Sequence, residues 1–163
     1  MLISIISDTH DRLDTLQNAL EIINNHQADL LIHAGDFVSP FAVKKFAQFQ
    51  GPIFAVRGNN DGDTDNLTLA WKNIIQADYR EGLSTFQIGD LQINLQHFPY
   101  TTEQLAALSG DLFIYGHTHH LDIHEEKGRL IINPGECCGW ITGKSSFVFY
   151  DTLTRKIEVC QKN

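Results

Sequence analysis

The ten residues from Tyr115 to His124, YGHTHHLDIH, contain four of the chain's eight histidines. His117 and His119 are two residues apart, and so are Asp8 and His10 in the segment SDTH near the start of the chain. In an extended segment, side chains two residues apart leave the same face, so each pair can point toward one ligand. Imidazoles combined with carboxylates suit manganese, iron, zinc or nickel, whereas magnesium prefers oxygen. The two pairs therefore indicate a metal site.

Other residues able to bind metal stand where apolar runs end. Gly35-Asp36 follows one run, Gly58-Asn59 follows the next, and His97 follows a later one. In open α/β sheets, ligands gather outside the carboxyl ends of the strands, so segments distant in sequence can meet there. A carboxylate has two oxygens, which makes Asp36 the natural candidate to bridge two cations. Asn59 offers a neutral amide oxygen, and the glycines let the backbone turn sharply where a ligand must be aimed.

The first sixty residues alternate strands and helices. Short apolar runs predict strands, and apolar spacing of three and four predicts helices. The strands are expected at Leu2–Ser7, Leu30–His33 and Ile53–Val56, and the helices at Asp14–Asn25 and Pro40–Phe49, the latter with Phe41, Val43, Phe46 and Phe49 facing inward. This order favours a parallel sheet. Continuous apolar strands are also expected when helices cover both faces of the sheet.

The rest of the chain is richer in strands. Leu83–Ile88 and Leu91–Leu95 flank Gly89-Asp90, which is a tight hairpin signal. Further strands are expected at Leu112–Tyr115, Arg129–Asn133, Ser146–Tyr150 and Ile157–Cys160, helices at Leu67–Ile75 and Thr102–Leu108, and a hairpin turn at Thr152–Arg155. The pattern predicts two packed sheets flanked by helices in one domain, residues 1–163.

Composition narrows the classes of function. The formal net charge of −8 argues against an extended nucleic-acid-binding surface, so an anionic substrate would need a local positive centre such as a bound cation. No stretch approaches the ~20 apolar residues of a membrane helix, so no membrane partner is expected. Three cysteines, two of them adjacent, form no disulfide framework. Together with an N-terminus unlike a signal peptide, they favour the reducing cytoplasm.

The motifs DTH, GD, GNND, a lone His97 and GHTH, in this order, resemble those of the calcineurin-like metallophosphoesterase superfamily. VRGNND, NPGE and the short length resemble its small single-domain phosphodiesterase branch. The resemblance runs from about Leu2 to Gly135. It implies an α/β four-layer sandwich, in which two mixed β-sheets are flanked by α-helices, with a dinuclear metal centre.

The resemblance also implies the ligands. One cation would be held by Asp8, His10, Asp36 and His119, and the other by Asp36, Asn59, His97 and His117. Manganese is the first expectation for both, with nickel, iron, zinc, magnesium and cobalt as alternatives. Asp36, Asn59 and His97 would form the catalytic group, and a small phosphoester would be the substrate. A homodimer or homotetramer is the state that the resemblance implies.

The expected chemistry follows from two cations ~3.5–4 Å apart, which clamp the attacking and leaving oxygens of an in-line displacement. A hydroxide bridging them would attack phosphorus, and the cations would offset charge on the phosphoryl oxygens. Asn60 stands where many family members have a histidine that assists the leaving group, so good leaving groups are expected. Phe98 stands where the family usually has glycine, so the resemblance does not determine the local backbone path or the shape of the pocket. Asn60 and His120 are the candidate substrate contacts.

Other interpretations remain open at this point. Asp8 and His10 could cap the following helix, Asp36 could belong to a plain turn, and His97 could be structural. His33 is expected to be a satisfied core histidine, His26 a helix cap, and Cys137 and Cys138 inert and buried. As for function, the alternatives are a non-catalytic metal-binding scaffold that serves protein interaction on the same fold, or a metal-dependent hydrolase of another ester.

Overall fold

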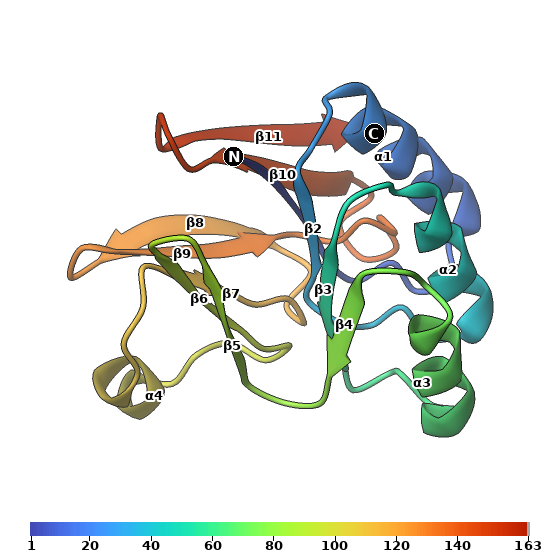
Figure 1. The fold of residues 1–163 in the computed structure, drawn as a ribbon, viewed down its shortest axis with the longest axis horizontal. Helices are drawn as coiled ribbons and strands as arrows, with labels where there is room; N and C mark the ends of the chain where they lie inside the picture. The colour runs from blue at the N-terminus through green and yellow to red at the C-terminus, as the bar shows by residue number, and fades with distance from the viewer. Residues whose placement is uncertain (163) are drawn as a thin grey trace.

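The computed structural model describes residues 1–162 and contains two β-sheets (Figure 1). The first sheet has six strands in the order β11-β10-β1-β2-β3-β4. Its strands are β1 (Leu2–Ile6), β2 (Leu30–His33), β3 (Ile53–Val56), β4 (Ala77–Arg80), β10 (Ser145–Asp151) and β11 (Lys156–Lys162). Strands β1 to β4 are parallel, while β10 pairs antiparallel with both β1 and β11, so the sheet is mixed.

The second sheet has five strands in the order β5-β6-β7-β9-β8. They are β5 (Ser84–Ile88), β6 (Leu91–Leu95), β7 (Leu112–Ile114), β8 (Leu121–Glu126) and β9 (Arg129–Pro134). The central pairs β6–β7 and β7–β9 are parallel, and the outer pairs are antiparallel hairpins. This sheet is therefore also mixed, as expected.

The helices lie outside the two sheets. Figure 1 shows α1 (Leu13–Asn25), α2 (Pro40–Lys45) and α3 (Thr64–Lys72) beside the six-stranded sheet, and α4 (Thr102–Ala107) beside the other. Three apolar clusters separate these layers: one under α1–α3, one between the sheets, and a small one beneath α4. The predicted four-layer α/β sandwich is confirmed.

Neighbouring residues of the central strands face different layers. Ile3 and Ile5 of β1 belong to the cluster between the sheets, whereas Ile6 belongs to the cluster under the helices. The expectation that helices cover both faces of the parallel sheet was wrong, because the second sheet covers one of them. An apolar covering of either kind produces the same continuous run of apolar residues.

Helix α2 differs most from its predicted form. It ends at Lys45 and continues as a 3₁₀ turn over Phe46–Gln48. Val43, Phe46 and Phe49 are buried as expected, but Phe41 is 69% exposed. Ser39 caps the helix through its hydroxyl, which accepts a hydrogen bond from the Phe41 N–H, and places Phe41 in the first turn on the solvent side.

Two strands, β4 and β8, were not predicted, and α3 begins earlier than expected. Strand β4 is a polar edge strand, and β8 carries Asp122, His124 and Glu125, so neither shows an apolar run. Helix α3 starts at Thr64, where Asp63 accepts a hydrogen bond from the Asn66 N–H at 3.3 Å. The predicted turn at Thr152–Arg155 does connect β10 to β11. Within residues 1–162, every helix is too short or too polar to cross a bilayer.

Candidate metal centre

The predicted ligands lie together at the carboxyl ends of strands from both sheets. Asp8, Asp36 and Asn59 follow β1, β2 and β3 of the six-stranded sheet. His97 follows β6 of the five-stranded sheet, and the segment with His117 and His119 follows β7. The His117 N–H donates to Asp8 Oδ2 at 3.1 Å and so joins the two sheets at this edge.

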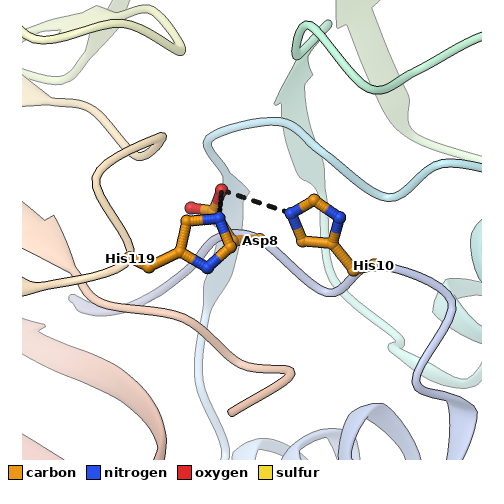
Figure 2. Close-up of side chains that lie close together, drawn as sticks. All are labelled: Asp8, His10 and His119. Atoms are coloured by element: carbon orange, nitrogen blue, oxygen red, sulfur yellow. Dashed lines mark ion pairs between the residues drawn. The ribbon is translucent and has the colours of Figure 1, made fainter. Parts of the chain in front are cut away.

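One group of side chains gathers around Asp8 (Figure 2). Asp8 Oδ1 lies 3.5 Å from His119 Nε2 and 3.8 Å from His10 Nε2. The rings of His10 and His119 stack with their centroids 5.0 Å apart. These three ligand atoms lie within 4.8 Å of one another, which is a spacing that one metal ion can span.

A second group gathers around Asn59. Its side-chain oxygen Oδ1 lies 2.9 Å from His97 Nε2 and 2.8 Å from His117 Nδ1. The other nitrogen of His97, Nδ1, lies 2.8 Å from the Ala34 carbonyl oxygen and is positioned to donate to it, which fixes the ring orientation and leaves Nε2 facing the site. Asn59 is exposed while His97 is only 2% exposed, so this group runs from the protein interior to its surface.

Asp36 lies between the two groups. Its Oδ2 is 3.4 Å from His10 Nε2 and 3.3 Å from His97 Nε2. Burial raises the pKa of Asp36, but His97 and the hydrogen bonds from Asn60 outweigh it and hold this pKa well below its usual value. Asp36 is therefore an anion placed between two sets of nitrogen donors, which is the position required of a bridging carboxylate.

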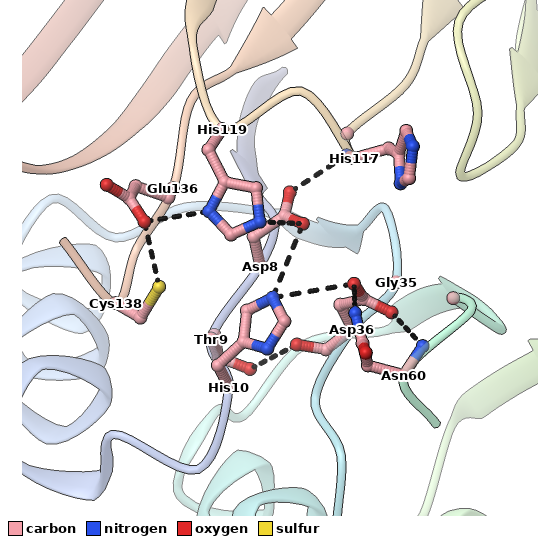
Figure 3. Close-up of polar contacts among 12 residues, drawn as sticks. Asp8, Thr9, His10, Gly35, Asp36, Asn60, His117, His119, Glu136 and Cys138 are labelled. Atoms are coloured by element: carbon pink, nitrogen blue, oxygen red, sulfur yellow. Dashed lines mark hydrogen bonds and ion pairs between the residues drawn. The ribbon is translucent and has the colours of Figure 1, made fainter. Parts of the chain in front are cut away.

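Among residues 1–162, two buried atoms of the first group find no hydrogen-bond partner: Asp8 Oδ1 and His10 Nε2. A buried polar atom without a partner is unfavourable by about 1–3 kcal/mol. His10 Nε2 lies between Asp8 Oδ1, at 3.8 Å, and Asp36 Oδ2, at 3.4 Å (Figure 3). A divalent cation would satisfy both at once, so the residues present fit a metal ion.

The backbone around the ligands is strained. Asp8, His10, Asp36, His117 and His119 all have positive φ, between 39° and 66°. The expectation that the pairs Asp8/His10 and His117/His119 lie in extended segments was wrong, because each pair lies in a tight turn after its strand. Residues other than glycine rarely adopt positive φ, and such strain concentrates at functional sites.

The glycines beside the ligands act mainly through close packing. A Cβ on Gly58 would overlap the carboxylate of Asp36, and one on Gly116 would overlap Ser7 Oγ and approach Asp8 Oδ2 to 2.8 Å. Among Gly35, Gly58 and Gly116, Gly35 alone has positive φ, at 99°. Gly58 therefore lets the loop after β3 approach Asp36, and Gly116 lets the loop after β7 approach Ser7 and Asp8.

Asp61 is a positioning residue for which the sequence analysis proposed no role. It is 1% exposed, and its carboxylate accepts N–H groups from Asp36 at 3.1 Å, Val38 at 2.6 Å and Gly58 at 2.7 Å. It thus joins the loop after β2 to the loop after β3. Val38 is held there at a φ of 74°, a rare value for a β-branched residue. The sequence signal that could have identified Asp61 is its place as the fourth residue of the motif GNND.

Glu136 is a second positioning residue without a predicted role (Figure 3). It is fully buried, and its Oε2 lies 2.8 Å from His119 Nδ1. The same carboxylate accepts the N–H groups of Trp140, Ile141 and Thr142. Burial raises the pKa of Glu136, but the bonds from His119 and Thr142 outweigh this effect and lower it to about 2. The ionised carboxylate of Glu136 therefore orients the ring of His119. The sequence signal that could have identified Glu136 is its place as the last residue of the motif NPGE.

The two candidate substrate contacts lie at the surface of the site. Asn60 is exposed, and its N–H and side-chain amide donate to Asp36 at 2.8 and 2.7 Å. His120 is exposed, and its Nδ1 lies 2.6 Å from the Thr118 carbonyl oxygen. The structure therefore gives Asn60 a positioning contact with Asp36, while contact of either residue with substrate stays a prediction.

The residues expected to be structural behave as such. His33 is fully buried, and its Nδ1 accepts the Gly35 N–H at 3.0 Å. Its Nε2 therefore carries the proton and bonds Thr9 Oγ1 at 3.2 Å, and burial lowers the pKa of His33 to about 3. His26 caps α1 through Nδ1, 2.9 Å from the Ile22 carbonyl oxygen. Cys137 and Cys138 are buried, and burial raises both thiol pKa values.

Known proteins are similar to this chain in sequence. The profile of the calcineurin-like phosphoesterase superfamily domain matches residues 1–155. Phosphodiesterase MJ0936 of Methanocaldococcus jannaschii is 39% identical over 155 residues, which is 93% of each chain. Phosphodiesterase YfcE of Escherichia coli is 29% identical over 151 residues, covering 83% of this chain and 78% of that protein.

A solved structure agrees with the sequence comparisons. The structure of an archaeal phosphodiesterase superposes with a TM-score of 0.92 at 35% identity, covering 99% of this chain and all of that one. The motifs, the four layers and the clustered ligand residues thus lead to one family. The chain belongs to the calcineurin-like phosphoesterase superfamily.

Proposed function

We propose that this protein is a metal-dependent phosphodiesterase. The observation that supports it is the position of Asp36 between two groups of nitrogen and oxygen donors, with Asp8 Oδ1 and His10 Nε2 buried and unpaired beside it. The names of the relatives, two of them phosphodiesterases, support the same reaction class. The entire proposed site lies within residues 1–155, which match the family profile.

The proposed site holds two divalent cations. Asp8, His10, Asp36 and His119 would hold one, and Asp36, Asn59, His97 and His117 the other. When bound, such cations activate water and offset the charge that builds on phosphoryl oxygens. Asp36, Asn59 and His97 are the proposed catalytic group, since they meet where the two ligand sets join.

Manganese is the first candidate metal, ahead of nickel, iron, zinc, cobalt and magnesium. Four of the seven proposed ligands are imidazoles, which disfavours magnesium because that ion prefers oxygen donors. Two divalent cations would also supply positive charge to a chain of net charge −8, which would otherwise repel a phosphodiester anion.

The proposed substrate is a small phosphodiester with a good leaving group. The Asn60 amide is too weakly acidic to protonate a departing alkoxide, and it already donates a hydrogen bond to Asp36. An acidic leaving group such as a nitrophenol needs no such proton. Contact of Asn60 and His120 with substrate belongs to this proposal, as do a cytoplasmic location and a dimeric or tetrameric assembly.

Hydrolysis of bis(4-nitrophenyl) phosphate by metal-loaded protein tests the proposal. Activity is expected with Mn²⁺ or Ni²⁺, and chelation should abolish it. Asp36→Asn should remove most of it, because one bridging negative charge is lost. Metal uptake without hydrolysis of any phosphoester would favour the scaffold instead. Hydrolysis of carboxylic esters alone would favour a hydrolase of another ester.

A further inference from the structure

Two exposed aromatic side chains stand beside the metal centre without an evident structural reason. Phe98 is 51% exposed and Trp140 is 63% exposed. We call them the aromatic rim. Aromatic rings bury large apolar areas when they pack, so rings left open to water next to a site are candidates for ligand contact.

Phe98 lies beside the second ligand group. Its ring is tilted against that of His117 with centroids 4.6 Å apart, and edge-on to that of His97 at 5.3 Å. Gln96 donates its side-chain amide to the Phe98 carbonyl oxygen at 2.8 Å and holds this turn in place. One part of the ring rests on the ligand histidines, and about half of the residue surface remains open.

Trp140 lies beside the first ligand group. Its N–H donates to Glu136 at 3.0 Å, and its indole nitrogen approaches the His10 carbonyl oxygen at 3.5 Å. The Arg12 guanidinium covers the ring at 4.7 Å from the centroid, and Arg12 also donates to the Cys138 carbonyl oxygen at 2.6 Å. The indole is therefore positioned beside His10 although most of it is exposed.

The two rings flank the centre from opposite ligand groups. Trp140 approaches the main-chain carbonyl oxygen of His10, and Phe98 contacts the ring of His97. His10 and His97 belong to different ligand groups, and their Nε2 atoms lie 3.4 and 3.3 Å from Asp36 Oδ2. A phosphodiester placed at the centre has two ester groups that leave phosphorus in different directions. One ester group can therefore extend toward each ring.

We propose that Phe98 and Trp140 determine specificity by each stacking on one planar aromatic ester group of the phosphodiester. This inference rests on the proposed function and narrows it to diesters that carry aryl groups or nucleobases. Stacking on aromatic side chains tolerates different planar groups, because each presents a π-face. The rim would thus select planarity rather than one particular base.

The kinetic test compares two substrates with the same leaving group, bis(4-nitrophenyl) phosphate and methyl 4-nitrophenyl phosphate. Phe98→Leu and Trp140→Leu keep an apolar side chain and remove the flat ring. One ring of the rim would contact the ester group that stays on phosphorus after 4-nitrophenol leaves. The leucine variant at that ring should reduce the preference for the diaryl substrate about tenfold. The other variant should lower kcat/KM for both substrates, and both effects should appear mainly in KM.

A matched control is Phe41→Leu, which removes an exposed ring from α2, and its kinetics should equal those of the wild type. Unchanged substrate preference and unchanged KM in both rim variants would overturn the inference. A dinucleoside monophosphate run in parallel identifies the source of the planar group. If the rim variants hydrolyse the dinucleoside monophosphate more slowly than the wild type does, the rim binds nucleobases. If they are slower only on the aryl diesters, the rim binds other aryl groups.

A binding measurement separates this inference from the proposed activity. The chain has two tryptophans, of which Trp71 is 1% exposed and Trp140 is 63% exposed. Bis(4-nitrophenyl) phosphate should quench Trp140 fluorescence in metal-loaded protein, and Trp140→Leu should abolish that quenching. Absence of quenching in the wild type would overturn the inference even if the diester is hydrolysed. Quenching without hydrolysis would instead contradict the proposed function and support the rim.

Discussion

His119 and Glu136 form a buried pair in which Nδ1 of the imidazole lies 2.8 Å from Oε2 of the carboxylate. The pair leaves His119 Nε2 facing Asp8 at 3.5 Å. The Glu136 carboxylate, whose pKa is lowered, is placed to accept an N–H from Nδ1, an arrangement that turns Nε2 toward the site. A carboxylate behind a histidine in this way orients a metal ligand and raises its basicity.

The first prediction is that Glu136→Gln weakens metal binding. Glutamine preserves the side-chain shape but removes the negative charge, so the ring of His119 is less basic and less firmly oriented. We expect affinity for Mn²⁺ to fall by roughly 10- to 100-fold, as measured by isothermal titration calorimetry. Glu158→Gln, at an exposed glutamate on β11, is the matched control and should bind like the wild type. Equal affinity in both variants would refute the role of Glu136.

The second prediction concerns Asp61 and folding stability. In Asp61→Asn one carboxylate oxygen becomes an amide donor, which then faces N–H groups that need an acceptor. The expected loss is about 1–3 kcal/mol of unfolding free energy, measured by urea denaturation in the presence of a chelator. Asp63→Asn is the control, because asparagine and aspartate cap helices almost equally. The prediction fails if the two variants unfold alike.

Much of the fold was predictable because strongly apolar strands leave a clear pattern. The strands at Leu30–His33, Ile53–Val56 and Leu91–Leu95 have the predicted bounds. The polar edge strand β4 left no such pattern, since its partners and not its own residues make it a strand. Phe41 was misplaced because the helix period gives relative directions along a helix, while the cap at Ser39 sets its actual start.

The candidate site was predictable in its members but not in its supporting residues. Asp8, His10, Asp36 and His97 were recognised by residue type and by their place after strands, and the structure brings them together. Asp61 and Glu136 act on backbone N–H groups of loops whose paths no local pattern reveals. The positive φ of the candidate ligand residues was likewise unpredictable, because none of them is a glycine, the residue type that marks such a conformation in a sequence.

The third prediction is that pH has opposite effects on metal-free stability and on metal binding. Asp8 raises the pKa of His10 above 6.5, and this effect outweighs burial. A raised histidine pKa stabilises the metal-free fold fully below 6.5, and this stabilisation is lost as pH rises through the folded pKa. A cation needs the neutral ring, so Mn²⁺ affinity should fall as pH decreases through that same folded pKa.

Chemical denaturation with a chelator, repeated across pH, measures the slope of metal-free stability against pH. Calorimetric Mn²⁺ titration across the same range measures the slope of metal affinity against pH. His10→Gln should make both pH dependences shallower, with the remainder due to groups such as His97, whose pKa is also raised. His124→Gln, at an exposed histidine on β8, should change neither. Slopes of the same sign in the wild type would contradict the assignment of His10 as a ligand.

The fourth prediction is that Gly116→Ala damages the site although alanine is small. Its Cβ would overlap Ser7 Oγ and press on Asp8 Oδ2, so the loop after β7 must move away from β1. His117 and His119 would move with it, because both follow Gly116 within three residues. We expect a stability loss of about 1–3 kcal/mol from overpacking, together with weaker Mn²⁺ binding. Gly62→Ala is the matched control, since a Cβ there meets no atom within 4 Å, and its stability and affinity should equal those of the wild type. If Gly116→Ala is destabilised but binds Mn²⁺ as tightly as Gly62→Ala does, the loop after β7 does not hold the metal.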